Sequence, residues 1–309
     1  MGWASTQTAA FFPAVATDLV LEACPTPSPG PGEVLIRNHA IAINPVDWKR
    51  QAWGFMIPSY PAILGSDIAG IVAEVGESVT AVKPGDRVLG LAHGFPPRRP
   101  LCFVPAATVP IAAATAVVAL YDVLGLPQPS PDKAPNSSAS SILVWGASSA
   151  VGSIVVQLAR LSGLTVFAAA SERHHAHLRS LGASVVVDYH SPTAVADLVA
   201  AAKKAGKEIE YAVDAICEPD TIKPTVEVLS ASTAATKKVV HTLDWPAGVP
   251  QPEGIQNQQL CHEALPKWLE TGAIVPLQHR VIEGGLGGIQ NAMDQVKKGI
   301  SGEKLVVEL

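Results

Sequence analysis

A glycine-rich turn is the clearest chemical signal in the chain. The run "VWGASSAVGS" (residues 144–153) joins an expected strand to an expected helix, and Gly146 and Gly152 bracket Ser148 and Ser149. A bound diphosphate requires a tight turn with little side-chain bulk, and a helix N-terminus whose partial positive charge faces the anion. Ser149 stands where the usual pattern has its middle glycine, but a hydroxyl can itself donate to phosphate. The turn predicts a dinucleotide site; a tight strand–helix connection without a ligand is the alternative.

The end of the next expected strand indicates which dinucleotide binds. Ser171 lies close to the position where an NAD enzyme places an acid that holds both ribose hydroxyls. A serine followed by Arg173 suits a 2′-phosphate, whose charge an aspartate would repel. Glu172 argues for NADH, although acids are also favoured in the first turn of a helix. We therefore expect NADPH.

The histidines and cysteines do not form a metal-binding pattern. His174, His175 and His177 follow one another in an expected exposed helix with no carboxylate partner, so a solvated face is preferred to a metal site. The cysteines are widely spaced and include no C-x-x-C pair, which predicts neither a zinc knuckle nor a disulfide framework and favours a reducing cytosol. They are Cys24, Cys102, Cys217 and Cys261.

Two kinds of pattern must position these groups. In the first hundred residues, short β-rich runs at 33–45, 67–76 and 86–92 are separated by Gly, Pro and Asp, which predicts a small β-barrel-like domain. From residue 140 onward, strands alternate with helices, which predicts a doubly wound parallel sheet. The expected strands are 141–146, 164–170, 184–189, 209–216 and 237–243. The Pro- and Ser-rich segment 127–141 is an expected linker.

Length and charge limit the class of protein. With 309 residues the chain is long enough for two cores, and 48% hydrophobic residues with 16% charged ones indicate a globular α/β protein. A net charge of −5 gives no footprint for nucleic acid or an anionic membrane. The N-terminus lacks the pattern of a signal peptide, and the longest apolar run, 106–120, contains a proline and predicts a buried helix. We expect a cytoplasmic protein with a small-molecule ligand.

Five motifs together resemble a known family. They are "NPVDWK" (44–49), "YPAILGSDIAGIVAEVG" (60–76), "VKPGDRVLG" (82–90), the glycine-rich turn and "SGEKLVVEL" (301–309). They are similar to the medium-chain dehydrogenase/reductase superfamily, within it to the zinc-free quinone oxidoreductases, and most of all to the trans-acting enoyl reductases of fungal polyketide synthases. The resemblance implies a GroES-like β-barrel catalytic domain (1–110 and 273–309), an inserted Rossmann domain (111–272), and a nicotinamide cleft between them.

The resemblance also argues against a metal. Zinc-dependent relatives carry a cysteine where this chain has Asn44, and Gly-His-Glu where it has Gly65, Ser66 and Asp67; their structural-zinc cysteines are absent as well. Tetrahedral zinc then lacks thiolate or imidazole ligands. The chemistry that remains is hydride transfer from NADPH to an electron-poor alkene, followed by protonation of the enolate.

Site residues follow by matching the family motifs. Lys49 is the expected active-site residue, as proton donor, oxyanion stabiliser or phosphate contact; a solvent-facing lysine is the alternative. Asn44 is expected to bond the nicotinamide ribose or the substrate, and Asp47 and Trp48 to fix the local backbone and packing. Lys304 resembles a cofactor contact, with a surface lysine as its alternative. The expected cofactor set is Gly146, Ser148, Ser149, Val151, Gly152, Ser171, Arg173, Tyr189, Ile216, Leu243 and Lys304.

Two segments of the family pattern are missing, so both domains are expected to be shortened. Residues 95–107, "FPPRRPLCFVPAA", lead almost directly to an expected helix at Ala112, where relatives insert a barrel strand that shields the cleft. Residues 246–259 stand where relatives have an edge strand that pairs across the two-fold axis of their dimers. We therefore expect a monomer, and a nicotinamide pocket that is more open to water.

Three functions compete on these observations. The first is an NADPH-dependent enoyl or quinone reductase that acts on a small-molecule or carrier-bound polyketide substrate, with a polyketide synthase as a candidate partner. The second is a redox-silent member of the same fold that catalyses a cyclisation or isomerisation. The third is a non-catalytic binding protein or a shortened gene product.

Overall fold

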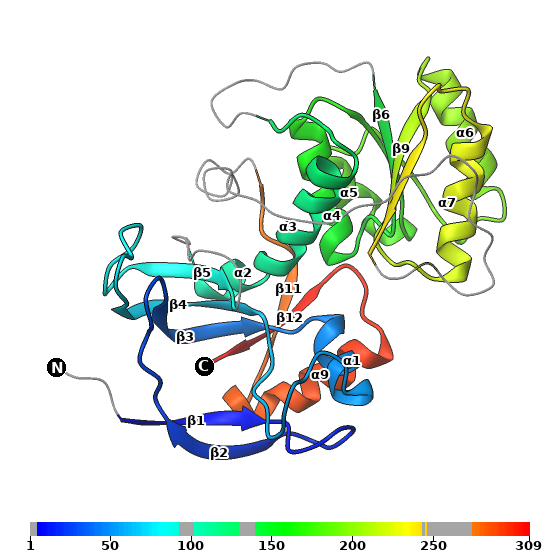
Figure 1. Ribbon diagram of the computed structural model, residues 1–309. Helices are drawn as coiled ribbons and strands as arrows, with labels where there is room; N and C mark the ends of the chain where they lie inside the picture. Colours follow the sequence, from blue (N-terminus) through cyan, green and yellow to red (C-terminus); the bar gives the residue numbers. More distant parts are fainter. Residues whose placement is uncertain (1–4, 93–101, 130–139, 243–244, 246–273) are drawn as a thin grey trace. The chain divides into compact units, whose positions relative to one another are not determined.

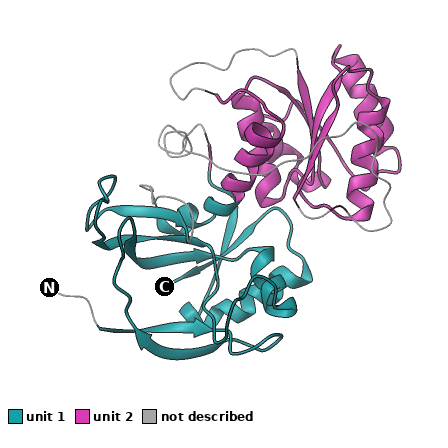
Figure 2. Ribbon diagram, viewed as in Figure 1, with its two compact units in different colours: residues 1–111, 276–309 teal, residues 112–275 magenta. Residues whose placement is uncertain are grey.

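The structure is a computed structural model, and it describes residues 5–92, 102–129, 140–242, 245 and 274–309. The chain forms two compact units, residues 1–111 with 276–309 and residues 112–275 (Figure 2). Unit 1 is therefore built from both ends of the chain, and unit 2 is inserted between them. This is the expected combination of a GroES-like domain with a Rossmann-like parallel sheet.

The described part of unit 1 contains one mixed sheet and a separate hairpin. The sheet order is β11 (His279–Ile282), β12 (Lys304–Glu308), β3 (Val34–Ala42), β4 (Asp67–Val75) and β5 (Arg87–Leu91) (Figure 1). Only β11 and β12 are parallel. Strands β1 (Thr6–Phe11) and β2 (Val20–Pro25) form the antiparallel hairpin. Because β3 lies between β12 and β4, residues from the two chain ends meet on neighbouring strands.

Two helices cover a core in unit 1. Helix α1 (Pro45–Trp53) packs against α9 (Ile289–Lys298), which follows a 3₁₀ turn at Gly285–Gly288. Asn44 caps α1, Pro45 supplies its first residue, and Gly54 ends it with a φ of 68°. These are the residue types that favour a helix start and a left-handed stop. The shared core includes Phe12, Ile43, Met293, Leu305 and Val307.

Unit 2 contains a doubly wound parallel sheet, as expected. Its order is β10 (Lys238–His241), β9 (Ile209–Asp214), β6 (Ser141–Trp145), β7 (Thr165–Ala169) and β8 (Val185–Val187). All its described strand pairs are parallel. The chain runs outward from β6 to β8 and then returns to β9, so the strand order reverses between β6 and β9. Ligands of such sheets bind at this switch point, beyond the carboxyl ends of the strands.

The helices of unit 2 follow the strands in sequence. They are α4 (Ala150–Leu161), η2 (Glu172–His174, a 3₁₀ turn), α5 (His175–Leu181), α6 (Ala194–Lys204) and α7 (Pro219–Ala231). All five residues of β6 are buried, as is typical of a parallel strand covered on both faces. A core that includes Leu143, Phe167, Leu198, Ile222 and Val239 lies between the sheet and its helices.

The apolar segment at the start of unit 2 and just before it is helical over a longer range than expected. Helix α2 (Phe103–Ala107), α3 (Pro110–Val117) and a π-helical turn (Val118–Val123) follow one another. The expected start at Ala112 is therefore wrong. Pro105 falls in the first turn of α2, where a backbone N–H has no helical partner, so the proline does not prevent the helix.

This segment is also long and apolar enough to cross a membrane by length and composition. Across Phe103–Val123, 72% of the most apolar window is buried inside the protein. A core helix has the same composition, and its burial here agrees with the buried helix that the sequence predicts.

Candidate functional site

The glycine-rich turn lies at the switch point of the unit 2 sheet. It joins the carboxyl end of β6 to the N-terminus of α4. Gly146 has a φ of 69°, and a Cβ atom on it would lie 2.5 Å from Ile216 Cγ1. A Cβ on Gly152 would collide with the carbonyl oxygen of Gly146 and lie 2.8 Å from Ala147 Cα. Both positions thus require glycine, which leaves backbone uncovered beside a helix N-terminus.

The serines of the turn occupy the start of α4. Ser149 is the N-cap, and its Oγ accepts a hydrogen bond from Gly152 N at 3.0 Å. A hydroxyl that accepts can still donate its own hydrogen. Ser148 and Val151 are half-buried beside it. The structure thus brings five of the predicted cofactor residues into one turn.

Asp214 shapes the neighbouring loop, and sequence reasoning missed it. It ends β9 and is fully buried. Its Oδ1 accepts hydrogen bonds from Ile216 N at 2.9 Å and Cys217 N at 3.0 Å, and its Oδ2 accepts one from Thr221 Oγ1 at 2.8 Å. Burial raises the pKa of Asp214, while these bonds oppose the shift. The acid holds Ile216 against Gly146, and an acid at the end of the apolar run "IEYAVD" was the signal for it.

The ends of β7 and β8 bring together the residues predicted to choose the dinucleotide. Ser171 Oγ lies 3.4 Å from Tyr189 Oη as a hydrogen-bond donor. Arg173 is exposed, and its Nε donates to His174 Nε2 at 3.1 Å. Burial, with the neighbouring Arg173 charge next, lowers the pKa of His174, which favours the neutral ring that can accept this bond. Leu243, the remaining unit 2 residue of the predicted set, lies outside the described residues.

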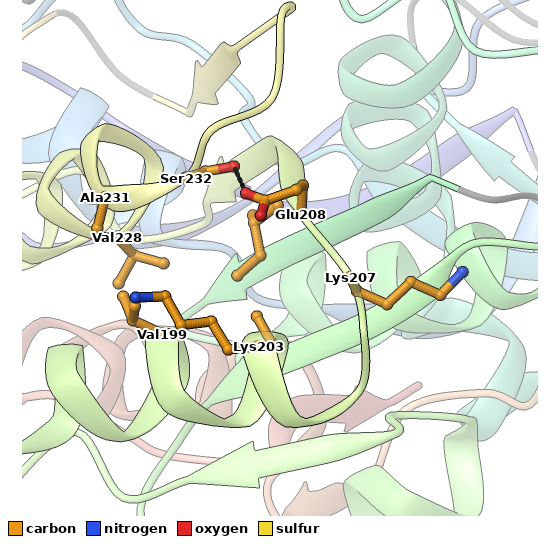
Figure 3. Close-up of a pocket in the computed structure, with 9 residues that line it drawn as sticks. Val199, Lys203, Lys207, Glu208, Val228, Ala231 and Ser232 are labelled. Carbon is orange, nitrogen blue, oxygen red and sulfur yellow. Dashed lines mark hydrogen bonds between the residues drawn. The ribbon is translucent and has the colours of Figure 1, made fainter.

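The small pocket in Figure 3 lies at the opposite end of β9. It is lined by residues of α6 and α7 and by Glu208, which precedes the strand. Glu208 accepts a hydrogen bond from Ser232 at 2.9 Å across it. Its volume of about 10 Å³ is enough for roughly one water molecule. Neither its size nor its place at the amino ends of the strands suits a dinucleotide.

Unit 1 contains a buried polar cluster that joins three strands. Asn44 follows β3, Asp67 begins β4 and Lys304 begins β12. The Lys304 ammonium donates to Asn44 Oδ1 at 2.5 Å and to Asp67 Oδ2 at 2.8 Å, and Asn44 Nδ2 donates to Asp67 Oδ2 at 3.0 Å. Ile111 N donates to Asp67 Oδ1 at 2.7 Å. Lys304 is only 3% exposed, so the alternative of a surface lysine is wrong.

Asp47 adjoins this cluster. It is 3% exposed; its Oδ2 accepts a hydrogen bond from Asn44 N at 2.7 Å. Its Oδ1 is buried with no hydrogen-bond partner among the described residues. Burial raises the pKa of Asp47 to about 6. The sequence prediction that Asp47 fixes the local backbone is consistent with its bond to Asn44 N, but it gave no sign of this titration.

Lys49 lies apart from the buried cluster. Its Nζ is 5.7 Å from the ring centroid of Trp48 and 5.9 Å from that of Trp53, and these two rings make an edge contact at 5.6 Å. Two indole faces stabilise an ammonium group by cation–π attraction. The structure therefore places the two predicted catalytic residues differently, with Asn44 in the buried cluster and Lys49 beside half-exposed aromatic rings.

The described residues offer little for a metal ion. Within them, no group of three or more His, Cys, Asp or Glu side chains lies at ligand distance. Cys24, Cys102 and Cys217 form no disulfide bond within the described residues, and Cys261 lies outside them. The polar atoms gathered around Asn44 instead surround the ammonium group of Lys304.

Comparisons with known proteins agree with this division of the chain. The family model for the alcohol dehydrogenase GroES-like domain matches residues 30–103, and the model for zinc-binding dehydrogenases matches residues 150–234. The trans-enoyl reductase tndF of Aspergillus flavipes is 33% identical over 97% of this chain and 98% of its own length. The trans-enoyl reductase himH of Aspergillus japonicus is 34% identical over 90% of both chains.

The fold of the whole chain is shared with a solved structure, and the alignment with tndF contains gaps in this chain. An alcohol dehydrogenase superfamily protein from Novosphingobium aromaticivorans, 23% identical, matches 98% of this chain and 99% of its own with a TM-score of 0.77, which shows the same fold. The alignment with tndF spans 345 positions, whereas this chain has 309 residues, so at least 36 of those positions lack a counterpart here. Such gaps are consistent with the missing segments that the sequence pattern predicts.

Proposed function

The chain belongs to the medium-chain dehydrogenase/reductase superfamily, in the group that includes fungal trans-enoyl reductases, and from this premise we propose that it reduces an activated carbon–carbon double bond with NADPH and without zinc. Enzymes of this superfamily use nicotinamide cofactors. The choice of NADPH, the zinc-free reaction and the substrate class are the proposal.

The observation that carries the proposal is the tight backbone turn that requires glycine at positions 146 and 152. A side chain at Gly146 would meet Ile216, and one at Gly152 would collide with the backbone of the turn, so only glycine permits this close turn beside the N-terminus of α4. Backbone N–H groups there suit the diphosphate of a dinucleotide. Ser171, Tyr189 and the exposed guanidinium of Arg173 follow the next two strands, where a 2′-phosphate requires donors and positive charge and an acid would repel it.

The donor set in unit 1 supports chemistry without zinc. Asn44, Ser66 and Asp67 provide no thiolate or imidazole ligand. Asn44 and Asp67 also already bind the Lys304 ammonium. A second cation would have to displace this buried charge or be repelled by it.

Bound NADPH supplies a hydride for the β-carbon of an enoyl or quinone substrate. The protein must then stabilise the enolate oxygen and deliver a proton. Lys49 is the proposed group for one of these tasks, because its ammonium is a half-buried donor held over two indole rings. Asn44 is less free than expected, since its amide already bonds Lys304 and Asp67.

The proposed substrate is an α,β-unsaturated polyketide, free or bound to a carrier protein. Its support is the similarity of this chain to two trans-enoyl reductases. A polyketide synthase that supplies this acyl chain is the proposed partner. We also propose a monomer, because residues 246–259 lack the alternating apolar run of an edge strand; a dimer in light scattering at micromolar concentration contradicts this.

The first experiment is a thermal-shift titration with NADPH and NADH. A ligand at a hundred times its Kd stabilises the folded state by about 2.7 kcal/mol, so NADPH should raise Tm by several degrees and NADH by less. Gly152→Val should abolish both shifts because its side chain would collide with the backbone of Gly146 and Ala147 and distort the turn. Gly287→Val, in the exposed 3₁₀ turn before α9 where a Cβ meets nothing within 4 Å, is the control that tests a glycine change away from the turn.

The second experiment is oxidation of NADPH in the presence of activated alkenes, including an enoyl thioester. Oxidation that depends on the alkene supports the reductase. No NADPH shift and no oxidation with any alkene contradict it. Conversion of a substrate without cofactor, undiminished in Ser149→Ala and Arg173→Ala, would instead show a cyclisation or isomerisation on this fold.

A further inference from the structure

We propose that Asp47 is a positioning residue whose buried carboxyl group takes up and releases a proton, and that this proton sets the net charge of the network it forms with Asn44, Asp67 and Lys304. The uptake of the proton follows from the geometry of unit 1 alone. Its effect on the cofactor rests on the proposed function, in which the protein binds an anionic dinucleotide.

The network has one cation for two carboxyl groups. Asn44, Asp47, Asp67 and Lys304 are each no more than 4% exposed, so solvent screens their charges weakly. With Asp47 protonated, the negative Asp67 and the positive Lys304 cancel. With Asp47 ionised, the network carries one negative charge. A single proton thus separates two charge states of a buried site.

The hydrogen bonds decide which carboxyl group takes the proton. Asp67 accepts from three donors, Ile111 N, Asn44 Nδ2 and Lys304 Nζ. Asp47 accepts from Asn44 N, and its Oδ1 has no partner among the described residues. Hydrogen bonds to the charged form stabilise a carboxylate, whereas burial without them favours the neutral acid. The geometry therefore places the exchangeable proton on Asp47.

Other groups around Asp47 keep its pKa close to 6. Burial raises its pKa to about 6, and Asp67 on β4 acts in the same direction. The bond from Asn44 N, Lys304 on β12 and Arg50 on α1 oppose the rise.

Helix α9, which packs on α1, adds few charges at this contact. It presents the neutral Gln290 to Gln51 at 2.9 Å, and its Asp294 accepts a hydrogen bond from Gln290 at 3.0 Å. The carboxyl group of Asp47 therefore gains or loses its proton near pH 6.

The consequence for the site concerns anions. A neutral network repels an anionic ligand less than a network that carries one negative charge. Ionisation of Asp47 adds a negative charge to the same network and strengthens that repulsion. We expect cofactor affinity to fall as the pH rises through 6, for a reason separate from the charge of the cofactor itself.

The first test measures the proton directly. Protein with ¹³C-labelled aspartate carboxyl groups is titrated by NMR, and the resonance of Asp47 is the one absent from Asp47→Asn. We expect its midpoint near 6, whereas an ordinary aspartate titrates at about 3.9. A midpoint below about 4.5 overturns the whole proposal. This readout needs no activity, so it remains decisive if the proposed reductase function fails.

The second test measures the effect on the cofactor. Asp47→Asn keeps an oxygen that can accept from Asn44 N but cannot ionise. The quantity to measure is the NADPH dissociation constant of the wild type divided by that of Asp47→Asn. The 2′-phosphate of NADPH has a pKa of about 6, but its titration affects both proteins equally and cancels in this ratio. We expect the ratio to be near one at pH 5 and to rise by roughly three- to tenfold at pH 8, as one extra charge produces at an effective dielectric constant of about 20.

A control variant tests whether removal of any acid from the first turn of a helix has the same effect. Asp220→Asn removes an exposed acid from the first turn of α7 and should leave the ratio flat across this pH range. A flat ratio for Asp47→Asn, despite an NMR midpoint near 6, would overturn the link from the proton to the cofactor. If neither protein binds NADPH, the proposed function has failed, and the NMR midpoint alone decides whether Asp47 holds the proton.

Discussion

Replacing Lys304 with methionine tests the buried network of unit 1 most directly. The two side chains have similar volumes, so the change removes the charge and leaves little cavity. Asp67 loses the 2.8 Å bond from the ammonium, and Asn44 Oδ1 loses its 2.5 Å donor. Removing one partner of a buried ion pair typically costs about 3–5 kcal/mol, because the remaining charge stays buried without its partner. We expect Lys304→Met to lower the free energy of unfolding of unit 1 by about this amount.

The assay must report on unit 1 alone, since a chain with two compact units need not unfold in one step. Hydrogen exchange of the β3 and β4 amides in increasing urea meets this need. The second variant is Asp67→Asn, and the double variant completes a cycle in which we expect a coupling energy of at least about 2 kcal/mol. Lys297→Met, on the exposed face of α9, is the control and should change stability by less than about 0.5 kcal/mol.

Two results would refute this reasoning. The first is a loss below about 1 kcal/mol for Lys304→Met, which is the size of an exposed ion pair. The second is a coupling energy close to zero, which would mean that Lys304 and Asp67 act independently.

Three further predictions concern single residues. Gly152→Ala should destabilise unit 2 by about 1–3 kcal/mol in urea unfolding, because its Cβ would collide with the backbone of the preceding turn; a neutral effect would contradict the tight turn. Arg173→Ala should weaken NADPH binding in a fluorescence titration about tenfold or more and leave NADH unchanged, whereas Arg179→Ala, exposed on α5, should affect neither. The pKa of Asp47 rises from 3.8 to about 6 on folding, so its contribution to stability is complete below pH 4 and is lost as the pH rises through 6. The free energy of unfolding of the wild type in urea should therefore fall by up to about 3 kcal/mol over this range, and that of Asp47→Asn should not. Equal pH profiles of stability for the two proteins would refute this prediction.

Local sequence patterns predicted the fold class and the part of the candidate site that lies in unit 2. The spacing of Gly146, Ser149 and Gly152 between an apolar strand and an apolar helix specified a turn whose geometry the structure bears out. The alternation of strands and helices specified the parallel sheet, and neighbouring strand ends then brought Ser171 close to Tyr189. These features depend on residues close in sequence or on rules of chain connection.

The buried polar cluster of unit 1 depends instead on contacts between residues that lie far apart in the sequence. Lys304 and Asn44 are 260 positions apart and meet because β12 and β4 flank β3 in one sheet. The same closure buries Asp47 and raises its pKa, although its motif indicated only a helix start. Asp214 is different, because the partners that it holds are two, three and seven residues away, so a local pattern could have indicated it.

The sequence by itself therefore determined the superfamily, the two sheets and the dinucleotide turn, since each is written in consecutive or regularly spaced residues. Only the tertiary structure decided that Lys304 is a buried cation, that Lys49 lies with two indole rings, and that Asp47 is a buried acid with an unpaired oxygen. The physical reason is that burial and charge pairing arise from distant strands brought together in register, and desolvation then changes what each side chain can do.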